Sequence, residues 1–239
     1  MNKKTKLAIF DIDGTLFRSS LVIQLILELV KTGVFPKKVL KIMETDYEAW
    51  LNRRGSYENY IKKIIKIYYT SIRGCRKADI DNAVKKVLAV HKDRVYRFTR
   101  DLIKNLQRKG YYLLTISGSP TDIVEPFARY FGFKTSYGRI FEVKRGKFTG
   151  QVTNNVIMNH RKDQIVKDFL KRANLETDWE NSYAVGDTET EIPLLELVGH
   201  PIAFNPNSTL ARYAKKQGWQ IVVERKDVVF QLEKYKFLK

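Results

Sequence analysis

Residues 7–17 of this chain read Leu7-Ala8-Ile9-Phe10-Asp11-Ile12-Asp13-Gly14-Thr15-Leu16-Phe17. The apolar run that opens the stretch is short and bounded, as in a buried strand of a parallel sheet. Asp11 and Asp13 follow it, so they lie at the carboxyl end of the strand, where open α/β sheets bind their ligands. On a continuing strand the two carboxylates point to one side, and a divalent cation offsets their repulsion. A helix cap followed by a turn is the other interpretation of Asp and Gly at these positions.

The length and composition of the chain set the class of protein. Its 239 residues, 44% of them hydrophobic, suit one large domain or a core with a smaller inserted domain. The longest apolar run, residues 21–30, is interrupted by polar side chains and is too short to span a bilayer. We find no signal peptide, and the single Cys75 excludes an internal disulfide, so we expect a cytoplasmic protein.

The charge of the chain is strongly basic. Lys and Arg number 44 against 26 Asp and Glu, which gives a formal net charge of +18. Residues 18–97 hold 18 basic and 8 acidic side chains, so positive charge is about twice as dense there as elsewhere. A solvated surface or a compositional bias explains this excess. Attraction of an anionic substrate, a nucleic acid or a lipid surface is the second explanation, and we favour the first.

Residues 19–98 carry a helical pattern. Apolar side chains recur four apart from Leu21 to Val30, Thr32-Gly33 ends this helix, and Pro36 suits the first turn of the next. Further helices are expected over residues 39–50, 56–68 and 79–95, and four helices in this length predict a small bundle. Its aromatic residues fit either a packed core or a pocket for the organic part of a substrate: Phe35, Tyr47, Trp50, Tyr57, Tyr60, Tyr68 and Tyr69.

Beyond Phe98 the pattern alternates between helix and strand. The segments expected to form strands are residues 111–116, 182–185, 201–204 and 219–223, with a hairpin in residues 137–152 that turns at Lys144-Arg145-Gly146-Lys147. The segments expected to form helices are residues 102–110, 121–131, 159–170, 192–198 and 210–217. This order predicts the α/β class, with a Rossmann-like, doubly wound parallel sheet.

Four segments resemble, in order, the motifs of the haloacid dehalogenase (HAD) superfamily. They are residues 10–16, residues 115–120 (Thr-Ile-Ser-Gly-Ser-Pro), Lys162 near the start of a helix, and residues 184–191 (Ala-Val-Gly-Asp-Thr-Glu-Thr-Glu). One such short match is weak, but four in order at strand ends identify the chain as a member. The helical segment between the first two motifs resembles the cap of the phosphoserine-phosphatase-like branch. Residues 148–150, 200–206 and 218–219 are similar to the same branch. This division predicts a core of residues 1–17 and 98–239 and a cap of residues 18–97.

The resemblance implies a phosphatase, and phosphoryl transfer explains why these residue types are present. Such a reaction needs an in-line nucleophile, neutralisation of the phosphoryl oxygens and a proton donor for the leaving group. Asp11 would attack phosphorus and form an aspartyl phosphate, while Asp13 would act as general acid and then general base. Dehalogenating members lack a second Asp at this position. Mg²⁺ is the expected cofactor, bound by Asp11, Asp187 and, as the resemblance adds, the backbone carbonyl of Asp13.

The phosphate ligands expected from the same motifs are Thr15, Ser117, Gly118 and Lys162. A hydroxyl and an unhindered amide at a strand-to-helix turn suit a phosphate. Lys162 matches the family position of the compensating cation, although Arg161 and Lys167 are its neighbours.

Two departures from the family pattern concern the activity and the substrate. The supporting acid of the last motif is usually Asp, and in this chain it is Glu191, with Glu189 as the alternative residue for that role. Asn205 could either contribute to the site or form a turn. Phosphoserine-specific members carry a Glu shortly after the first motif, where this chain has Phe17-Arg18-Ser19-Ser20, which argues against free phosphoserine. We therefore expect a Mg²⁺-dependent hydrolase of a small phosphorylated metabolite. The alternatives are action on nucleic-acid ends or lipid phosphate, and a basic anion-binding protein with an impaired site.

Overall fold

The computed structural model describes residues 4–153 and 162–236. Its strands are β1 (Leu7–Phe10), β2 (Tyr112–Pro120), β3 (Thr135–Arg139), β4 (Phe141–Lys144), β5 (Lys147–Val152), β6 (Tyr183–Gly186), β7 (His200–Phe204), β8 (Gln220–Arg225) and β9 (Val228–Leu232). Its helices are α1 (Leu21–Lys31), α2 (Lys38–Leu51), α3 (Tyr57–Ile72), α4 (Lys77–His91), α5 (Arg97–Arg108), α6 (Thr121–Tyr130), α8 (Lys162–Ala173), α9 (Ile192–Leu195) and α10 (Ser208–Gln217), with a 3₁₀ turn at Glu189–Glu191.

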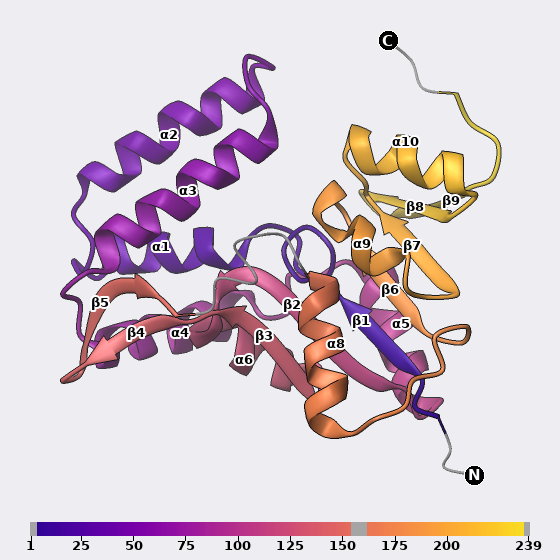
Figure 1. Cartoon of the computed structure of the whole chain (residues 1–239). Helices are drawn as coiled ribbons and strands as arrows, with labels where there is room; N and C mark the ends of the chain where they lie inside the picture. The colour runs from indigo at the N-terminus through magenta and orange to yellow at the C-terminus, as the bar shows by residue number, and fades with distance from the viewer. Residues whose placement is uncertain (1–3, 154–161, 237–239) are drawn as a thin grey trace.

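Seven strands form one twisted sheet in the order β3-β2-β1-β6-β7-β8-β9. Every neighbouring pair is parallel except β8 and β9, which run antiparallel. β1 therefore lies inside the sheet between β2 and β6, and the carboxyl ends of these three strands meet at one edge (Figure 1). The predicted fold class is confirmed. The sequence interpretation stopped at residue 223 and missed β9.

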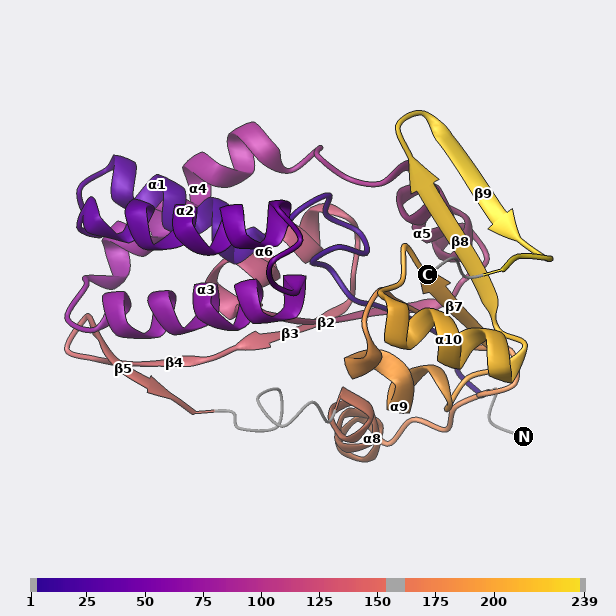
Figure 2. The ribbon, with the colours of Figure 1, turned by 90° about the horizontal axis from the view of Figure 1, so that it is seen from above.

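Side chains of β1 alternate between two hydrophobic cores, one on each face of the sheet. Ala8 and Phe10 belong to the cluster that includes side chains of α5 and α6. Leu7 and Ile9 belong to the other cluster, which α8, α9 and α10 cover. Figure 2 shows α8, α9 and α10 on one side of the sheet and α5 on the other. A strand buried on both faces explains the unbroken apolar run.

The segment that leads from β1 to α1 pairs through its backbone with the segment that leads from α4 to α5. Phe17 bridges Val95, the Arg18 amide donates to the Arg94 carbonyl at 3.0 Å, and the Tyr96 amide donates to the Leu16 carbonyl at 3.0 Å. The fourth helix was predicted to reach residue 95, and this is wrong: α4 ends at His91. The physical reason is that the segment of Val95 has to be extended to pair with the segment of Phe17.

The β4–β5 hairpin lies outside the main sheet and packs against the connection from α3 to α4 (Figure 1). The Gly74 amide donates to the Phe148 carbonyl at 2.8 Å, and the Phe148 amide donates to the Cys75 carbonyl at 2.9 Å. The predicted hairpin and its turn are confirmed for residues 141–152, whereas residues 137–139, predicted to belong to it, lie in β3 of the main sheet. The hairpin ties the polypeptide after β3 to helices of residues 18–97, and the division into core and cap stays a prediction.

Two further predicted boundaries differ from the structure, and a third lies outside the described residues. β2 continues past residue 116 to Pro120, because it pairs again with β3 after a shift in register. α9 ends at Leu195 instead of residue 198, since the chain turns at Gly199, where a Cβ would lie 1.9 Å from the Glu180 carbonyl oxygen. The helix expected over residues 159–170 is described from Lys162 onward, and residues 159–161 lie outside the described part.

The aromatic residues of α2 and α3 divide between core and surface. Phe35 and Tyr68 are buried, whereas Tyr47 is 43% exposed. Trp50 contacts Tyr57 with ring centroids 5.1 Å apart and Tyr60 at 6.2 Å, so the rings of the two helices form one cluster. Within residues 4–153 and 162–236, no helix is both long and apolar enough to cross a membrane.

Candidate active site

Asp11 lies directly beyond β1 and is held in place by the sheet. Its amide donates to the Val185 carbonyl of β6 at 3.0 Å, and the residue is 6% exposed. Its Oδ1 accepts a hydrogen bond from Lys162 Nζ at 2.6 Å. Lys162 is also buried, in the first turn of α8. A carboxylate and an amine that lie 151 residues apart in the chain thus meet at the carboxyl end of β1.

Glu191 is the second partner of the Lys162 amine. Its Oε1 accepts from Lys162 Nζ at 2.7 Å, and its Oε2 accepts from the amide and hydroxyl of Thr188 at 2.9 and 2.8 Å. The pair Thr188 and Glu191 forms a capping box at the 3₁₀ turn after β6. Gly186 makes room for this side chain, because a Cβ there would lie 2.5 Å from Glu191 Cγ.

Asp187 lies beside the turn that follows β1. Its Oδ1 accepts from the Thr15 hydroxyl at 3.1 Å. A Cβ on Gly14 would lie 2.2 Å from Asp187 Oδ2, and Gly14 has a φ of +84°, so only glycine fits there. The first and last motifs therefore approach each other closely, and the Thr15 hydroxyl, predicted to bind phosphate, contacts Asp187.

Burial dominates the electrostatics of these acids. Burial raises the pKa of Asp11 from 3.8 to about 7 against the opposing charge of Lys162. Burial, followed by the charges of Asp11 and Glu191, also raises the pKa of Asp187 well above its ordinary value. Burial acts to raise the pKa of Glu191 too, but the charge and hydrogen bond of Lys162 hold it below its usual value. One lysine leaves this buried group of acids short of positive charge.

A hard divalent cation fits this deficit of positive charge. Mg²⁺ prefers carboxylate and carbonyl oxygens, and Asp11 supplies a buried carboxylate and Asp187 a half-buried one near each other. Among the described residues, no group of three His, Cys, Asp or Glu side chains has the geometry of a preformed metal site. Two carboxylates completed by the Asp13 carbonyl and water are the donor set that these residues offer.

Asp13 connects the end of β2 with the start of α1. Its Oδ1 accepts from the Leu21 amide at 2.6 Å, and its Oδ2 accepts from the hydroxyls of Ser117 and Ser119 at 2.6 and 2.7 Å. Ser119 Oγ in turn accepts from the Val22 amide at 3.2 Å. The strand expected to continue through Asp13 ends at Phe10, so Asp11 faces Lys162 while Asp13 faces Ser117.

Gly118 lies between the two serines, just before the N-terminus of α6. Its carbonyl accepts from Arg139 Nε at 2.7 Å, and Arg139 is 8% exposed. Neither Ser119 nor Arg139 was singled out from the sequence. Ser119 stands inside the second motif and was readable as a second hydroxyl at the strand end, whereas Arg139 has no motif around it.

The alternatives to the predicted residues have other partners. Lys167 donates to Asp163 at 3.2 Å, and Arg161 lies outside the described residues. Glu189 accepts a hydrogen bond from the side chain of Asn207. Asn205 Oδ1 accepts from the Glu224 amide at 2.8 Å and the residue has a φ of +43°, which is the geometry of a turn.

The turn between α2 and α3 faces the edge of the sheet at which the candidate site lies. In both views it lies over the loop that follows β1 (Figures 1 and 2). Burial, followed by the charges of Asp187 and Asp13, raises the pKa of Tyr57 at the start of α3. The charges of both acids therefore disfavour ionisation of the Tyr57 hydroxyl.

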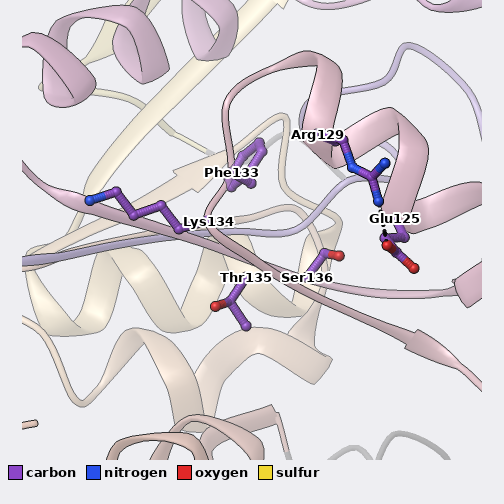
Figure 3. A pocket seen from close by; sticks show the side chains of 6 residues that line it. All are labelled: Glu125, Arg129, Phe133, Lys134, Thr135 and Ser136. Carbon is purple, nitrogen blue, oxygen red and sulfur yellow. Dashed lines mark hydrogen bonds and ion pairs between the residues drawn. The ribbon is translucent and has the colours of Figure 1, made fainter. Parts of the chain in front are cut away.

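A separate hollow of about 330 Å³ lies between α6 and β3 (Figure 3). It is lined by Glu125, Arg129, Phe133, Lys134, Thr135 and Ser136. Arg129 in this wall pairs with Glu125 at 2.6 Å. No residue of the acid and lysine group lines the hollow, so it is distinct from the candidate site.

The sequence model of the family of haloacid dehalogenase-like hydrolases matches residues 8–196 of this chain. This range includes every residue of the candidate site described above. The chain belongs to this family. Its sequence is 25% identical over 228 residues to that of phosphoserine phosphatase of Methanocaldococcus jannaschii. The match covers 95% of this chain and 96% of the relative. The HAD chain is 24% identical to histidinol-phosphatase of Neisseria meningitidis serogroup C, with 90% and 97% covered.

A solved structure of phosphoserine phosphatase, described as a phospho-aspartyl intermediate analogue, has the same fold. It superposes with a TM-score of 0.63 at 22% identity, with 94% of the HAD chain and 96% of that chain covered. The comparisons confirm the predicted superfamily, its phosphoserine-phosphatase-like branch and the enzyme class, a phosphatase. The roles predicted for single residues of the HAD chain are not tested by them.

Proposed function

We propose that the HAD chain is a Mg²⁺-dependent phosphatase that hydrolyses a phosphate monoester through an aspartyl phosphate on Asp11. The observation that carries the proposal is the buried Asp11 carboxylate, bound by Lys162 at 2.6 Å and close to Asp187 at the carboxyl edge of the sheet. The phospho-aspartyl analogue of the related phosphoserine phosphatase supports the same chemistry.

In the first step an Asp11 carboxylate oxygen attacks phosphorus, and the bond from phosphorus to the ester oxygen breaks. Asp13 delivers a proton to the departing alkoxide, so that a neutral alcohol leaves. In the second step a water oxygen attacks the phosphorus of the aspartyl phosphate while Asp13 takes a proton from that water. The bond between Asp11 and phosphorus breaks, and inorganic phosphate leaves.

The negative charge on the phosphoryl oxygens has to be neutralised during transfer. Lys162 provides a fixed cation that Glu191 and Asp11 hold at 2.7 and 2.6 Å. The Ser117 hydroxyl and the Gly118 amide lie near the end of β2, before α6, and would bind phosphoryl oxygens. Mg²⁺ held by Asp11, Asp187 and the Asp13 carbonyl would supply further positive charge to the phosphoryl group.

The substrate we propose is a small phosphorylated metabolite other than free phosphoserine. Relatives of similar length are named phosphoserine phosphatase and histidinol-phosphatase, so the branch includes more than one leaving group. The HAD chain has an exposed Arg18 after the first motif, and its guanidinium lies 5.5 Å from the Tyr96 ring centroid. A cation there suits a leaving group with an anionic or electron-rich part better than an ammonium.

The test is hydrolysis of a panel that contains an aryl phosphate, histidinol phosphate and phosphoserine, with and without Mg²⁺. The wild type is expected to turn over at least one monoester in a metal-dependent manner, and Asp11→Asn to lose that turnover. The exposed Asp101, which pairs with Arg100 on α5, provides the matched control Asp101→Asn. Full activity of Asp11→Asn, or no turnover of any monoester by the wild type, would contradict the proposal.

A further inference from the structure

Arg139 lies at the end of β3, outside all four motifs, and joins three parts of the molecule. Its Nε donates to the Gly118 carbonyl at 2.7 Å, and its Nη1 donates to the Tyr69 hydroxyl of α3 at 2.9 Å. The guanidinium carbon lies 5.9 Å from the Tyr69 ring centroid. The planar guanidinium carries several N–H donors at fixed angles, so it can bind the Gly118 carbonyl and the Tyr69 hydroxyl at the same time. A lysine amine in its place could not bind both.

The contact with Gly118 continues as a chain of hydrogen bonds. A trans peptide directs its C=O and N–H to opposite sides, so the Gly118–Ser119 peptide faces Arg139 with its carbonyl and Ser117 with its amide. The Ser119 amide donates to Ser117 Oγ at 2.9 Å, and Ser117 Oγ donates to Asp13 Oδ2 at 2.6 Å. In the substrate-free structure Ser117 Oγ accepts from this amide and directs its own hydrogen toward Asp13; as a phosphate ligand it would turn that hydrogen to a phosphoryl oxygen.

Neighbouring residues restrict the positions of the groups that make these hydrogen bonds. A Cβ on Gly138 would lie 2.8 Å from backbone atoms of Thr121, so β3 packs closely against the junction of β2 and α6, which follows Ser117 and Gly118. The Tyr69 ring packs edge-on against Phe141 of the hairpin, with centroids 4.9 Å apart. The position of α3 is thereby coupled to the orientation of a peptide in the candidate site.

We infer that Arg139 and Tyr69 are positioning residues that orient the Gly118–Ser119 peptide and, through Ser117, the carboxylate of Asp13. The inference rests on the proposed function, which makes Ser117 a phosphate ligand and Asp13 the proton donor. Hydrogen bonds in series polarise one another in a buried site, so the guanidinium strengthens the bond from Ser117 to Asp13. Movement of α3 away from the sheet would break the contact between Tyr69 and Arg139 and release this constraint.

The test compares Tyr69→Phe, Arg139→Lys and Arg139→Ala with the wild type. Tyr130→Phe and Arg129→Ala are matched controls, because the Tyr130 hydroxyl and the Arg129 guanidinium contact Asp93 and Glu125 at the surface. We measure kcat and KM for the best monoester, calorimetric affinity for inorganic phosphate with Mg²⁺ present, and the melting temperature. Since Arg139→Ala removes a buried side chain, the two conservative variants carry the test if it does not fold.

We expect Arg139→Ala to lose about 10-fold or more in kcat, the range for residues that orient a ligating group, and Tyr69→Phe to lose about 3-fold. Added guanidinium should partly restore Arg139→Ala and leave Tyr69→Phe unchanged. Phosphate affinity should fall in both conservative variants and stay at the wild-type value in both controls.

Wild-type kcat, KM and phosphate affinity in Tyr69→Phe and Arg139→Lys would overturn the inference. A lower melting temperature with unchanged kcat per folded molecule would overturn it as well, since that result describes a purely structural residue. Phosphate affinity is read without turnover, so this failure is distinct from failure of the proposed function, in which the wild type hydrolyses no monoester.

Discussion

Glu191 illustrates how one methylene group is accommodated beside a buried lysine. The family pattern has a shorter acid here, yet the Glu191 carboxylate reaches Lys162 with one oxygen and Thr188 with the other. The room for its longer stem comes from Gly186, where no Cβ fills the space near Glu191 Cγ. The substitution is therefore matched to its surroundings, which argues against an impaired site.

Shortening this acid should weaken the site instead of improving it. Glu191→Asp cannot span from the 3₁₀ turn to Lys162, and hydrogen bonds to charged groups contribute about 1.5–3 kcal/mol each. We expect kcat to fall about 10-fold and the free energy of unfolding to fall by about 2 kcal/mol. Steady-state kinetics and urea unfolding measure both.

The matched control is Glu189→Asp, because Glu189 contacts Asn207 and lies outside the lysine pair. It should retain wild-type kcat. Activity of Glu191→Asp equal to or above the wild type would show that Glu191 has no part in holding Lys162.

At the scale of elements, the N-terminus of α1 is bound by residues of the candidate site. The first helical amides donate to Asp13 Oδ1 and Ser119 Oγ, while Ser20, at the N-cap position, makes no side-chain cap bond. The first helix after the sheet is thus oriented by the proposed acid and by the end of β2. Substitution of Ser119 should affect both the helix and Asp13.

We expect Ser119→Ala to lower the free energy of unfolding by about 1–3 kcal/mol, because the buried Val22 amide and the half-buried Asp13 carboxylate each lose a partner. The kcat should fall as well, since Asp13 loses one of the donors that orient it. Ser20→Ala is the matched control, as Ser20 is equally buried but makes no cap bond. Equal losses of stability and kcat in the two variants would contradict this interpretation.

The sequence predicted the polar residues at strand ends better than the contacts between segments that are distant in the chain. Asp11, Ser117 and Asp187 follow apolar strands, so their convergence at one edge is a consequence of parallel pairing. Arg139 was missed because its contacts depend on the register shift between β2 and β3, which no periodicity encodes. The early end of α4 was missed because pairing with Phe17 overrides the helical pattern.

At the scale of the whole molecule, buried acids make stability depend on pH. The pKa of Asp11 is raised to about 7 and the pKa of Asp187 is raised well above its ordinary value, in both cases chiefly by burial. Between the ordinary pKa near 4 and the folded pKa, the native chain holds protons that the unfolded chain has released. The free energy of unfolding contributed by these acids therefore falls as pH rises through that interval.

We expect the metal-free wild type to lose melting temperature between about pH 4 and 7, and Asp187→Asn to lose less. Mg²⁺ should raise the melting temperature of the wild type at pH 8, because a ligand that binds only the folded state stabilises it. Thermal melts at several pH values, with EDTA or with Mg²⁺, measure this. A rise in stability over the same interval for metal-free protein would contradict the sign of the effect.

The central claim is that Asp11 carries the phosphoryl group, and acid-quenched mass spectrometry during turnover tests it most directly. In wild type and in Asp13→Asn, which loses the proposed base for the second step, we predict the added mass of one phosphoryl group, mapped to the peptide that contains Asp11. Asp11→Asn should show no added mass. Turnover without a phosphorylated form in either protein, or a phosphoryl group mapped to another residue, would contradict the account.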